Sequence, residues 1–149
     1  MLAVTGYSSA IIRQLASLIP DEEIVRIDFG SYQGYTCITN RFVLCAGVML
    51  SKRGITQTTQ ETAEGMRINY FFPMTMCDRI LTENTKARIC VIGSESGISG
   101  SYDDTYAAAK AALHSYIERK RLLYPDQQLV GIAPSIIEDA NMTLRREDH

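Results

Sequence analysis

The sequence lacks the clustered cysteine and histidine residues that form metal sites. No two cysteines have the C-x-x-C spacing, and the two histidines, His114 and His149, stand apart from the cysteines. A resident metal ion is therefore not expected. Three of the four cysteines lie inside apolar runs, so the cysteines are predicted to be small core residues. The four are Cys37, Cys45, Cys77 and Cys90.

A strong excess of charge and a long apolar segment are also missing. The formal net charge is −2 and the pI is near 5.7, which gives no broad attraction to nucleic acid or to an anionic membrane. No apolar stretch approaches the length that crosses a bilayer, and the N-terminus lacks the basic segment and apolar run of a secretion signal. A cytoplasmic protein with a small-molecule partner is expected.

Apolar runs that alternate with helical patterns are what the sequence does contain. Short apolar runs bounded by turn residues predict strands, and apolar residues at helical spacing predict helices. The predicted strands cover residues 1–6, 22–30, 41–50, 88–93 and 128–133, and the predicted helices cover 8–20, 58–81 and 105–124. Pro73 lies inside the second of these helices, where a proline can produce a kink.

The alternation of strands and helices predicts the class of the fold. Right-handed crossovers between parallel strands give an open sheet with helices on both faces, so we expect an α/β, Rossmann-like doubly wound parallel sheet. The chain has 149 residues and no repeat or linker, which favours a single domain over 1–149. Residues 133–149 form a tail without a strong pattern. Because the chain is short, some edge strands are expected to be trimmed.

A tyrosine and a lysine on the last predicted helix are the first candidates for chemistry. In Tyr106-Ala-Ala-Ala-Lys110, the separation of four residues places both side chains on one helix face. An ammonium group near a tyrosine favours the phenolate and lowers the tyrosine pKa from its usual value of about 10. Such a pair can move protons near neutral pH. The same spacing is also common on solvated helix faces. The surrounding sequence is therefore needed to distinguish a catalytic pair from two solvated residues.

The surrounding sequence supplies further polar residues at the ends of strands. Ser94 follows the strand at 88–93 and stands twelve residues before Tyr106, at the carboxyl end of a central strand, where open α/β sheets bind ligands. A Thr5-Gly6 turn follows the first strand, and Cys45-Ala46-Gly47 comes after the third. With these features in this order, the sequence resembles the short-chain dehydrogenase/reductase family.

The resemblance implies a catalytic group made of Ser94, Tyr106, Lys110 and Asn69. Tyr106 would exchange the hydroxyl proton, Ser94 would hydrogen-bond the substrate oxygen, and Lys110 would lower the tyrosine pKa and contact the nicotinamide ribose. Asn69 would hold a proton-relay water. Ser96 is a rival for the role of Ser94, because the loop is one residue short. Without the resemblance, Ser94 and Asn69 are equally well explained as residues that satisfy nearby backbone groups.

The resemblance also implies a dinucleotide site around the first turn. The family's T-G-x-x-x-G-x-G appears at 5–12 with only its first glycine, since Ala10 and Ile12 replace the other two. Ser8 and Ser9 can supply hydroxyl donors at a helix N-terminus that favours phosphate, and the two serines are equally well explained as a plain N-cap. The implied cofactor contacts are Gly6, Tyr7, Ser8, Ser9, Ala10, Ile11, Asp28, Ala46, Gly47, Lys110 and Pro134.

Two charged residues near the end of the second strand bear on the choice of cofactor. A carboxylate at Asp28 pairs with the adenosine ribose hydroxyls in this fold and repels a 2′-phosphate, which favours NAD over NADP. Arg26 favours NADP if its side chain faces the ribose. Either residue is also explained as a solvated strand end.

The function that follows is an NAD(P)-dependent oxidoreductase, which transfers hydride between nicotinamide and an alcohol or carbonyl substrate with Tyr106 as general acid/base. The alternative is a catalytically silent Rossmann-like module that binds a nucleotide or a protein, because two turn glycines are replaced and the family's substrate-lid extension is missing. The resemblance implies a homodimer or homotetramer, formed through the Asn-bearing helix and the Tyr-Lys helix. Pro134-Ser135 replaces the family's Pro-Gly after the last strand, and the sequence does not specify the substrate.

Overall fold

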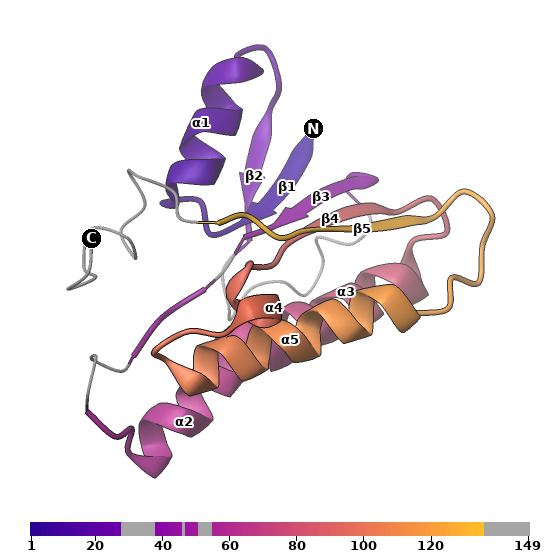
Figure 1. Cartoon of the computed structure of the whole chain (residues 1–149). Coiled ribbons are helices and arrows are strands. Elements are labelled where there is room, and N and C mark those ends of the chain that lie inside the picture. Colours follow the sequence, from indigo (N-terminus) through magenta and orange to yellow (C-terminus); the bar gives the residue numbers. More distant parts are fainter. Residues whose placement is uncertain (28–37, 46, 51–54, 136–149) are drawn as a thin grey trace.

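The computed structural model describes residues 1–27, 38–45, 47–50 and 55–135 (Figure 1). Within this part, five strands form one parallel sheet in the order β2-β1-β3-β4-β5. The strands are β1 (Leu2–Thr5), β2 (Ile24–Arg26), β3 (Arg41–Leu44), β4 (Arg88–Ile92) and β5 (Gln128–Ile132).

Helices lie on both faces of the sheet (Figure 1). One face carries α1 (Ala10–Leu18); the other carries α2 (Thr59–Met66), the π-helix η2 (Arg67–Phe71), α3 (Phe72–Glu83) and α5 (Asp104–Arg119). A short helix, α4 (Ser96–Ser99), lies between β4 and α5. The Rossmann-like, doubly wound α/β class predicted from the sequence is confirmed. None of the helices in the described ranges has the length and apolar character to cross a membrane.

Each face of the sheet has its own apolar cluster. Toward α3 and α5 the buried cluster contains Ala3, Ile27, Phe42, Leu44, Phe72, Met76, Cys77, Ile80, Leu81, Ala87, Ile89, Val91 and Leu113. Toward α1 a smaller cluster contains Leu2, Val4 and Ile12. Because side chains alternate along a strand, β1 contributes to both clusters and is buried along its whole length.

The strand order reverses at β1, which pairs with β2 on one side and with β3 on the other. In open α/β sheets, ligands bind outside the carboxyl ends of the strands at such a reversal. The amide of Cys45, just after β3, donates to Thr5 Oγ1 on β1 at 2.9 Å, so the two strand ends are joined directly. This edge of the sheet is where a ligand site is expected.

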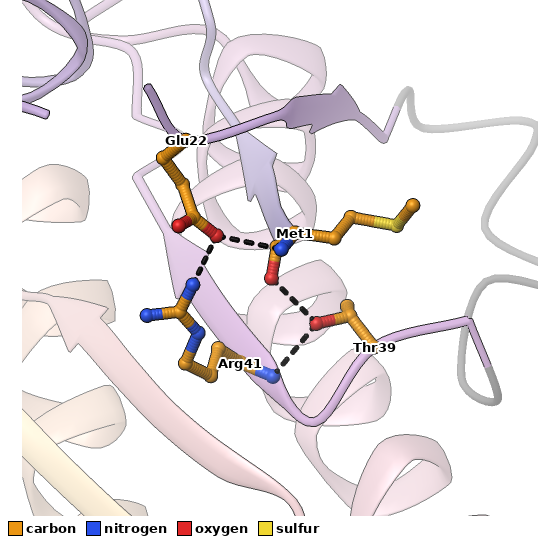
Figure 2. A network of polar contacts seen from close by, with 4 residues as sticks. All are labelled: Met1, Glu22, Thr39 and Arg41. Atoms are coloured by element: carbon orange, nitrogen blue, oxygen red, sulfur yellow. Dashed lines mark hydrogen bonds and ion pairs between the residues drawn. The ribbon is translucent and has the colours of Figure 1, made fainter. Parts of the chain in front are cut away.

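The opposite, amino-terminal edge of the same strands is held by a polar network (Figure 2). The Met1 amino group lies 2.7 Å from Glu22 Oε1, and Arg41 also pairs with this carboxylate. Both contacts lower the Glu22 pKa. Thr39 Oγ1 donates to the Met1 carbonyl at 2.8 Å and accepts from the Arg41 amide at 3.2 Å. The network joins β1 to the residues before β2 and to the start of β3.

Several predicted boundaries are wrong, and two of them have a clear physical cause. The strand predicted over 41–50 ends at Leu44, since the next amide bonds Thr5 Oγ1 and those of Val48 and Leu50 bond other side chains. The helix predicted over 105–124 ends at Arg119. Beyond it the chain turns back toward β5, and Pro125 disfavours a helical conformation at the residue before it.

The long helix predicted over 58–81 is present in three pieces, with the irregularity before Pro73 rather than at it. A proline has no amide hydrogen, and its ring crowds the carbonyl four residues earlier, which is that of Asn69. The chain widens into the π-helix η2 across this carbonyl and resumes as α3, with Pro73 in the first turn. The predicted kink is therefore a π-helix, a form found often at functional sites. Helix α4 was not predicted.

Candidate active site

Tyr106 and Lys110 lie one turn apart on α5, and both are buried: 7% and 2% of their surfaces are exposed. Lys110 Nζ lies 5.7 Å from the centroid of the Tyr106 ring. The same ammonium lies 3.4 Å from the carbonyl of Ile92, the last residue of β4. The pair is therefore not on a solvated helix face. It faces the carboxyl end of a central strand.

The environment of Lys110 changes its acidity. Burial lowers the Lys110 pKa from its ordinary value of 10.5 to about 8, and nearby Cys45 acts weakly in the opposite direction. The lysine therefore still carries its charge at pH 7 but titrates in the mildly alkaline range. A cation held in a buried position acts through a lower effective dielectric than a surface cation, which strengthens its effect on neighbouring groups.

Ser94 follows β4 and lies at the same edge of the sheet, with 8% of its surface exposed. Its Oγ accepts a hydrogen bond from the Ser96 amide at 3.1 Å, so its hydroxyl hydrogen is still available to another acceptor. Its own amide donates to His114 Nε2 on α5 at 3.2 Å. Ser94 is thus fixed to the helix that carries Tyr106 and Lys110. Its rival, Ser96, is the first residue of α4.

Asn69 lies in η2 and is completely buried. Its side chain makes two hydrogen bonds with one residue, because Oδ1 accepts from the Val48 amide at 2.8 Å and Nδ2 donates to the Val48 carbonyl at 2.7 Å. The side chain therefore holds the segment that follows β3. Binding to the backbone beside a neighbouring strand was one of the two interpretations left open by the sequence.

Asp103 is a buried residue of this site that the sequence analysis missed. It caps α5, since Oδ1 accepts from the Tyr106 amide at 2.8 Å, while Oδ2 accepts from the Leu50 amide at 3.1 Å. An Asp directly before a helical run is an N-cap signal that could have identified the first contact. The second contact joins residues 53 positions apart, and no local pattern predicts it.

The first turn is closed by hydrogen bonds at the N-terminus of α1. Gly6 has φ of +67°, a conformation that favours glycine, and its carbonyl accepts from the Ser9 amide at 2.9 Å. Ser9 is the N-cap of α1, with Oγ accepting from the Ile12 amide at 3.1 Å. Ala10 and Ile11 are the first residues of that helix. Ile12 is fully buried against Leu2 and Val4, so its side chain points away from the turn.

A thiol lies next to this turn. Cys45 Sγ is 3.5 Å from Ser9 Oγ, and Cys45 is half-buried. Burial raises the Cys45 pKa, while the hydrogen bond with Ser9 and the charge of Lys110 act in the opposite direction. The interaction with Lys110 brings the first turn, the end of β3 and the catalytic candidates on α5 into one neighbourhood.

The remaining cofactor candidates have fewer contacts that link them to this site. Ser8 and Gly47 are exposed, and Tyr7 lies under the guanidinium of Arg26, whose Cζ is 3.5 Å from the ring centroid. Pro134 follows β5, and its carbonyl accepts from the Glu95 amide at 2.9 Å. Asp28 and Ala46 lie outside the described residues. Across the described ranges, no three His, Cys, Asp or Glu side chains gather as ligands for a metal ion.

Helix α5 connects the four catalytic candidates. It carries Tyr106 and Lys110, and its His114 bonds the backbone of Ser94. Its cap, Asp103, and the Asn69 side chain both hold residues 47–50. Four residues from three separate segments are thus brought to one edge of the sheet, next to the turn that begins with Gly6.

Several solved structures superpose on this chain over most of its length. An aldohexose dehydrogenase of Thermoplasma acidophilum superposes with a TM-score of 0.77 at 15% identity, over 95% of this chain and 68% of the other. A short-chain dehydrogenase/reductase of Saccharomyces cerevisiae gives 0.75 at 15% identity, over 96% and 72%. Another, of Vibrio parahaemolyticus, gives 0.75 at 17% identity, over 90% and 75%.

These structures confirm the predicted resemblance at the level of the fold. The chain has the fold of short-chain dehydrogenase/reductases, and the similarity in sequence is low throughout. No family model matches the sequence, and no curated protein matches it.

Proposed function

We propose that this chain is an NAD(P)-dependent oxidoreductase of the short-chain dehydrogenase/reductase type, acting on an alcohol or carbonyl substrate. The observation that carries the proposal is the buried Lys110 ammonium beside Tyr106, at the carboxyl end of β4. A fold rarely buries a lysine without a use for it, and perturbed groups of this kind cluster at functional sites. A shared fold alone does not define a reaction, so the proposed reaction depends on these residues.

Each residue of the group has a role that its contacts support. Tyr106 donates its hydroxyl proton to the substrate oxygen during carbonyl reduction and accepts that proton during alcohol oxidation. Lys110 stabilises the phenolate form of Tyr106 by its charge. Ser94 donates its hydroxyl hydrogen to the same substrate oxygen and orients it. The nicotinamide, when bound, supplies or accepts the hydride at the substrate carbon.

Asn69 acts through its backbone, because its side chain is engaged with Val48. In an α-helix the Asn69 carbonyl would accept from the amide of residue 73, and Pro73 has no amide hydrogen. This carbonyl is therefore the group to which we assign the proton-relay water. Asn69 lies inside the π-helix η2, where hydrogen bonds follow the wider π pattern, as in the bond from the Phe72 amide to the Arg67 carbonyl.

The residues of the first turn fit a dinucleotide. The positive φ of Gly6, the Ser9 cap and the N-terminus of α1 present amide and hydroxyl donors at the edge where phosphate binds in this fold. The buried Ile12 side chain leaves the turn unobstructed although it replaces a glycine. Gly6, Tyr7, Ser8, Ser9, Ala10 and Ile11 would hold the pyrophosphate side. Ala46, Gly47, Lys110 and Pro134 would lie toward the nicotinamide.

The choice between NAD and NADP depends on two residues with opposite effects. Asp28 favours NAD, and Arg26, stacked on Tyr7 at the first turn, offers a cation to a 2′-phosphate. We keep a slight preference for NAD. An Arg26→Ala variant that loses NADPH affinity and keeps NADH affinity would reverse this preference.

The proposal is tested by titrating NADH and NADPH against nicotinamide fluorescence and thermal stability, since a bound ligand stabilises the folded state. At least one dinucleotide is expected to bind. A panel of alcohols and ketones then gives turnover, and Tyr106→Phe should lower kcat by about 10²–10⁴-fold with dinucleotide binding retained. Tyr124→Phe is the matched control, because Tyr124 is 41% exposed and lies beyond α5.

Three outcomes decide the proposal. Binding of neither dinucleotide contradicts it, and full turnover by Tyr106→Phe removes Tyr106 from the mechanism. Binding without turnover over a broad panel favours the catalytically silent module, the alternative suggested by the replaced glycines at Ala10 and Ile12.

We also propose that two copies associate through η2, α3 and α5. Phe71 lies on η2 with 57% of its surface exposed, and α5 presents the exposed small residues Ala108 and Ala111 on its outer side. Small residues allow helices to approach closely, and an exposed aromatic side chain is a common anchor of an interface.

A further inference from the structure

His114 is a half-buried residue of α5 to which the proposed reaction assigns no role. It lies one turn beyond Lys110 and two turns beyond Tyr106, so the three side chains share one face of the helix. The contact that marks it is the hydrogen bond from the Ser94 amide to His114 Nε2, 3.2 Å long. Through this bond α5 reaches the backbone of a residue on the neighbouring loop.

The imidazole fits into a slot formed by two glycines. A Cβ atom added at Gly93 would lie 2.1 Å from His114 Nε2 and 2.6 Å from Cδ2, and one added at Gly97 would lie 2.9 Å from Cε1. Real Cβ atoms do not approach other atoms this closely, so both positions require glycine while the ring is there. The loop on both sides of Ser94 is therefore shaped around this side chain.

The protonation state of the ring agrees with its role as an acceptor. Nε2 accepts the Ser94 amide, so in the neutral ring the proton is on Nδ1. Burial lowers the His114 pKa, the charge of Lys110 lowers it further, and Glu118 acts in the opposite direction. The loop residues that meet the ring, Gly93, Ser94 and Gly97, carry no ionisable side chain. The ring is thus a neutral acceptor at pH 7.

We propose that His114 is a positioning residue that fixes Ser94 relative to Tyr106 and Lys110 by accepting the Ser94 amide. This inference rests on the proposed function, because Ser94 needs a fixed position only if its hydroxyl orients a substrate. With the amide bonded to α5, Ser94 Oγ is set against the same helix that holds the other two groups. A shift of about 1 Å at a catalytic residue can cost as much as 10²-fold in rate.

Two substitutions at this position separate positioning from simple packing. His114→Gln keeps an acceptor near the place of Nε2, whereas His114→Leu fills part of the slot without one. We expect His114→Leu to lower kcat by about 10-fold with little change in dinucleotide affinity, and His114→Gln to recover most of the loss. The inference is overturned if wild type and His114→Leu have the same kcat, or if His114→Gln and His114→Leu lower kcat equally.

A second measurement does not depend on turnover. ¹⁵N NMR of the wild-type protein should show His114 with its proton on Nδ1 at pH 7, and the Ser94 amide resonance should titrate with the pKa of His114 as the pH falls below 6.5. If the Ser94 amide resonance does not change as His114 titrates, the inference is overturned and the proposed function is not affected. A protein in which the two groups titrate together but no substrate turns over contradicts the proposed function and, with it, the catalytic role of the bond.

Discussion

Lys110 is a charged residue in a buried position. Its side chain is 2% exposed, and burial lowers its pKa from 10.5 to about 8. A shift of this size means that the folded state disfavours the ammonium by about 3 kcal/mol relative to the unfolded chain. At pH 7 the protein therefore carries a charge that opposes its own folding.

The first prediction follows from this charge. Below pH 8 both the folded and the unfolded chain hold the Lys110 proton, so the free energy that burial of the ammonium subtracts from stability does not change with pH. Between about pH 8 and 10.5 only the unfolded chain holds it, so stability rises with pH through this window. A Lys110→Met variant, measured by urea unfolding, should be more stable than wild type at pH 7 by up to about 3 kcal/mol.

The comparison with Lys110→Met also removes the effect of other groups. Burial raises the pKa of Cys77 to about 12, and it also raises the pKa of Cys45. Thiols of this kind lower the stability of the folded protein as the pH rises, because they ionise more readily in the unfolded chain. Cys77 contributes equally in both proteins, so the difference between the two curves reports on Lys110 and on its interaction with Cys45. A difference that stays constant from pH 7 to pH 10.5 would show that Lys110 is not the titrating group.

At the scale of the element, α5 depends on its cap more than a typical helix. Asp103 accepts the Tyr106 amide and also the Leu50 amide, and it is 1% exposed. Loss of an N-cap side chain costs about 1 kcal/mol, and a buried amide left without a partner costs a further 1–3 kcal/mol. The cap therefore holds both the helix and the segment after β3.

We accordingly expect Asp103→Ala to lower the free energy of unfolding by about 2–4 kcal/mol, measured by urea denaturation. Asp104→Ala is the matched control, because Asp104 is the exposed neighbour in the first turn and should cost no more than about 1 kcal/mol through the helix dipole. If the two substitutions cost the same, the contact with Leu50 contributes nothing to stability.

The elements themselves were largely predictable, because hydrophobic period is a local property of the chain. All five described strands and the helices on both faces of the sheet follow from it. What failed are boundaries that depend on distant side chains, such as the end of β3, where Thr5 and Asn69 take the next amides. The π-helix was expected only as a kink at Pro73, because the sequence does not show how the chain accommodates a missing amide.

The candidate site was predictable where it depends on helix geometry and not where it depends on long-range contacts. The spacing of Tyr106 and Lys110 fixed their common face, and their burial at the sheet edge agrees with it. The second contact of Asp103 and the bond from Ser94 to His114 join residues far apart along the chain. No pattern of residue types specifies those pairs.

At the scale of the whole molecule, the outer surface of the long helices determines how copies associate. If the proposed dimer forms through η2, α3 and α5, Phe71→Arg should convert it to a monomer, measured by light scattering over a range of concentrations. A buried charge without a partner costs an interface several kcal/mol.

Leu18→Arg is the control for that experiment, because Leu18 is 69% exposed on α1, at the other face of the sheet. It should leave the assembly unchanged. An effect of Leu18→Arg alone would move the interface to the α1 face, and a wild-type protein that is monomeric at all concentrations would contradict the proposed dimer.

The buried lysine also determines how the chain should respond to selection in the laboratory. Most substitutions reach a population by drift unless they impair function, and a change that adds stability meets no resistance from folding. Replacement of Lys110 by an apolar residue would remove a buried charge and add stability. A library selected for stability alone should therefore favour an apolar residue at position 110, and a library selected for the proposed reaction should keep the lysine.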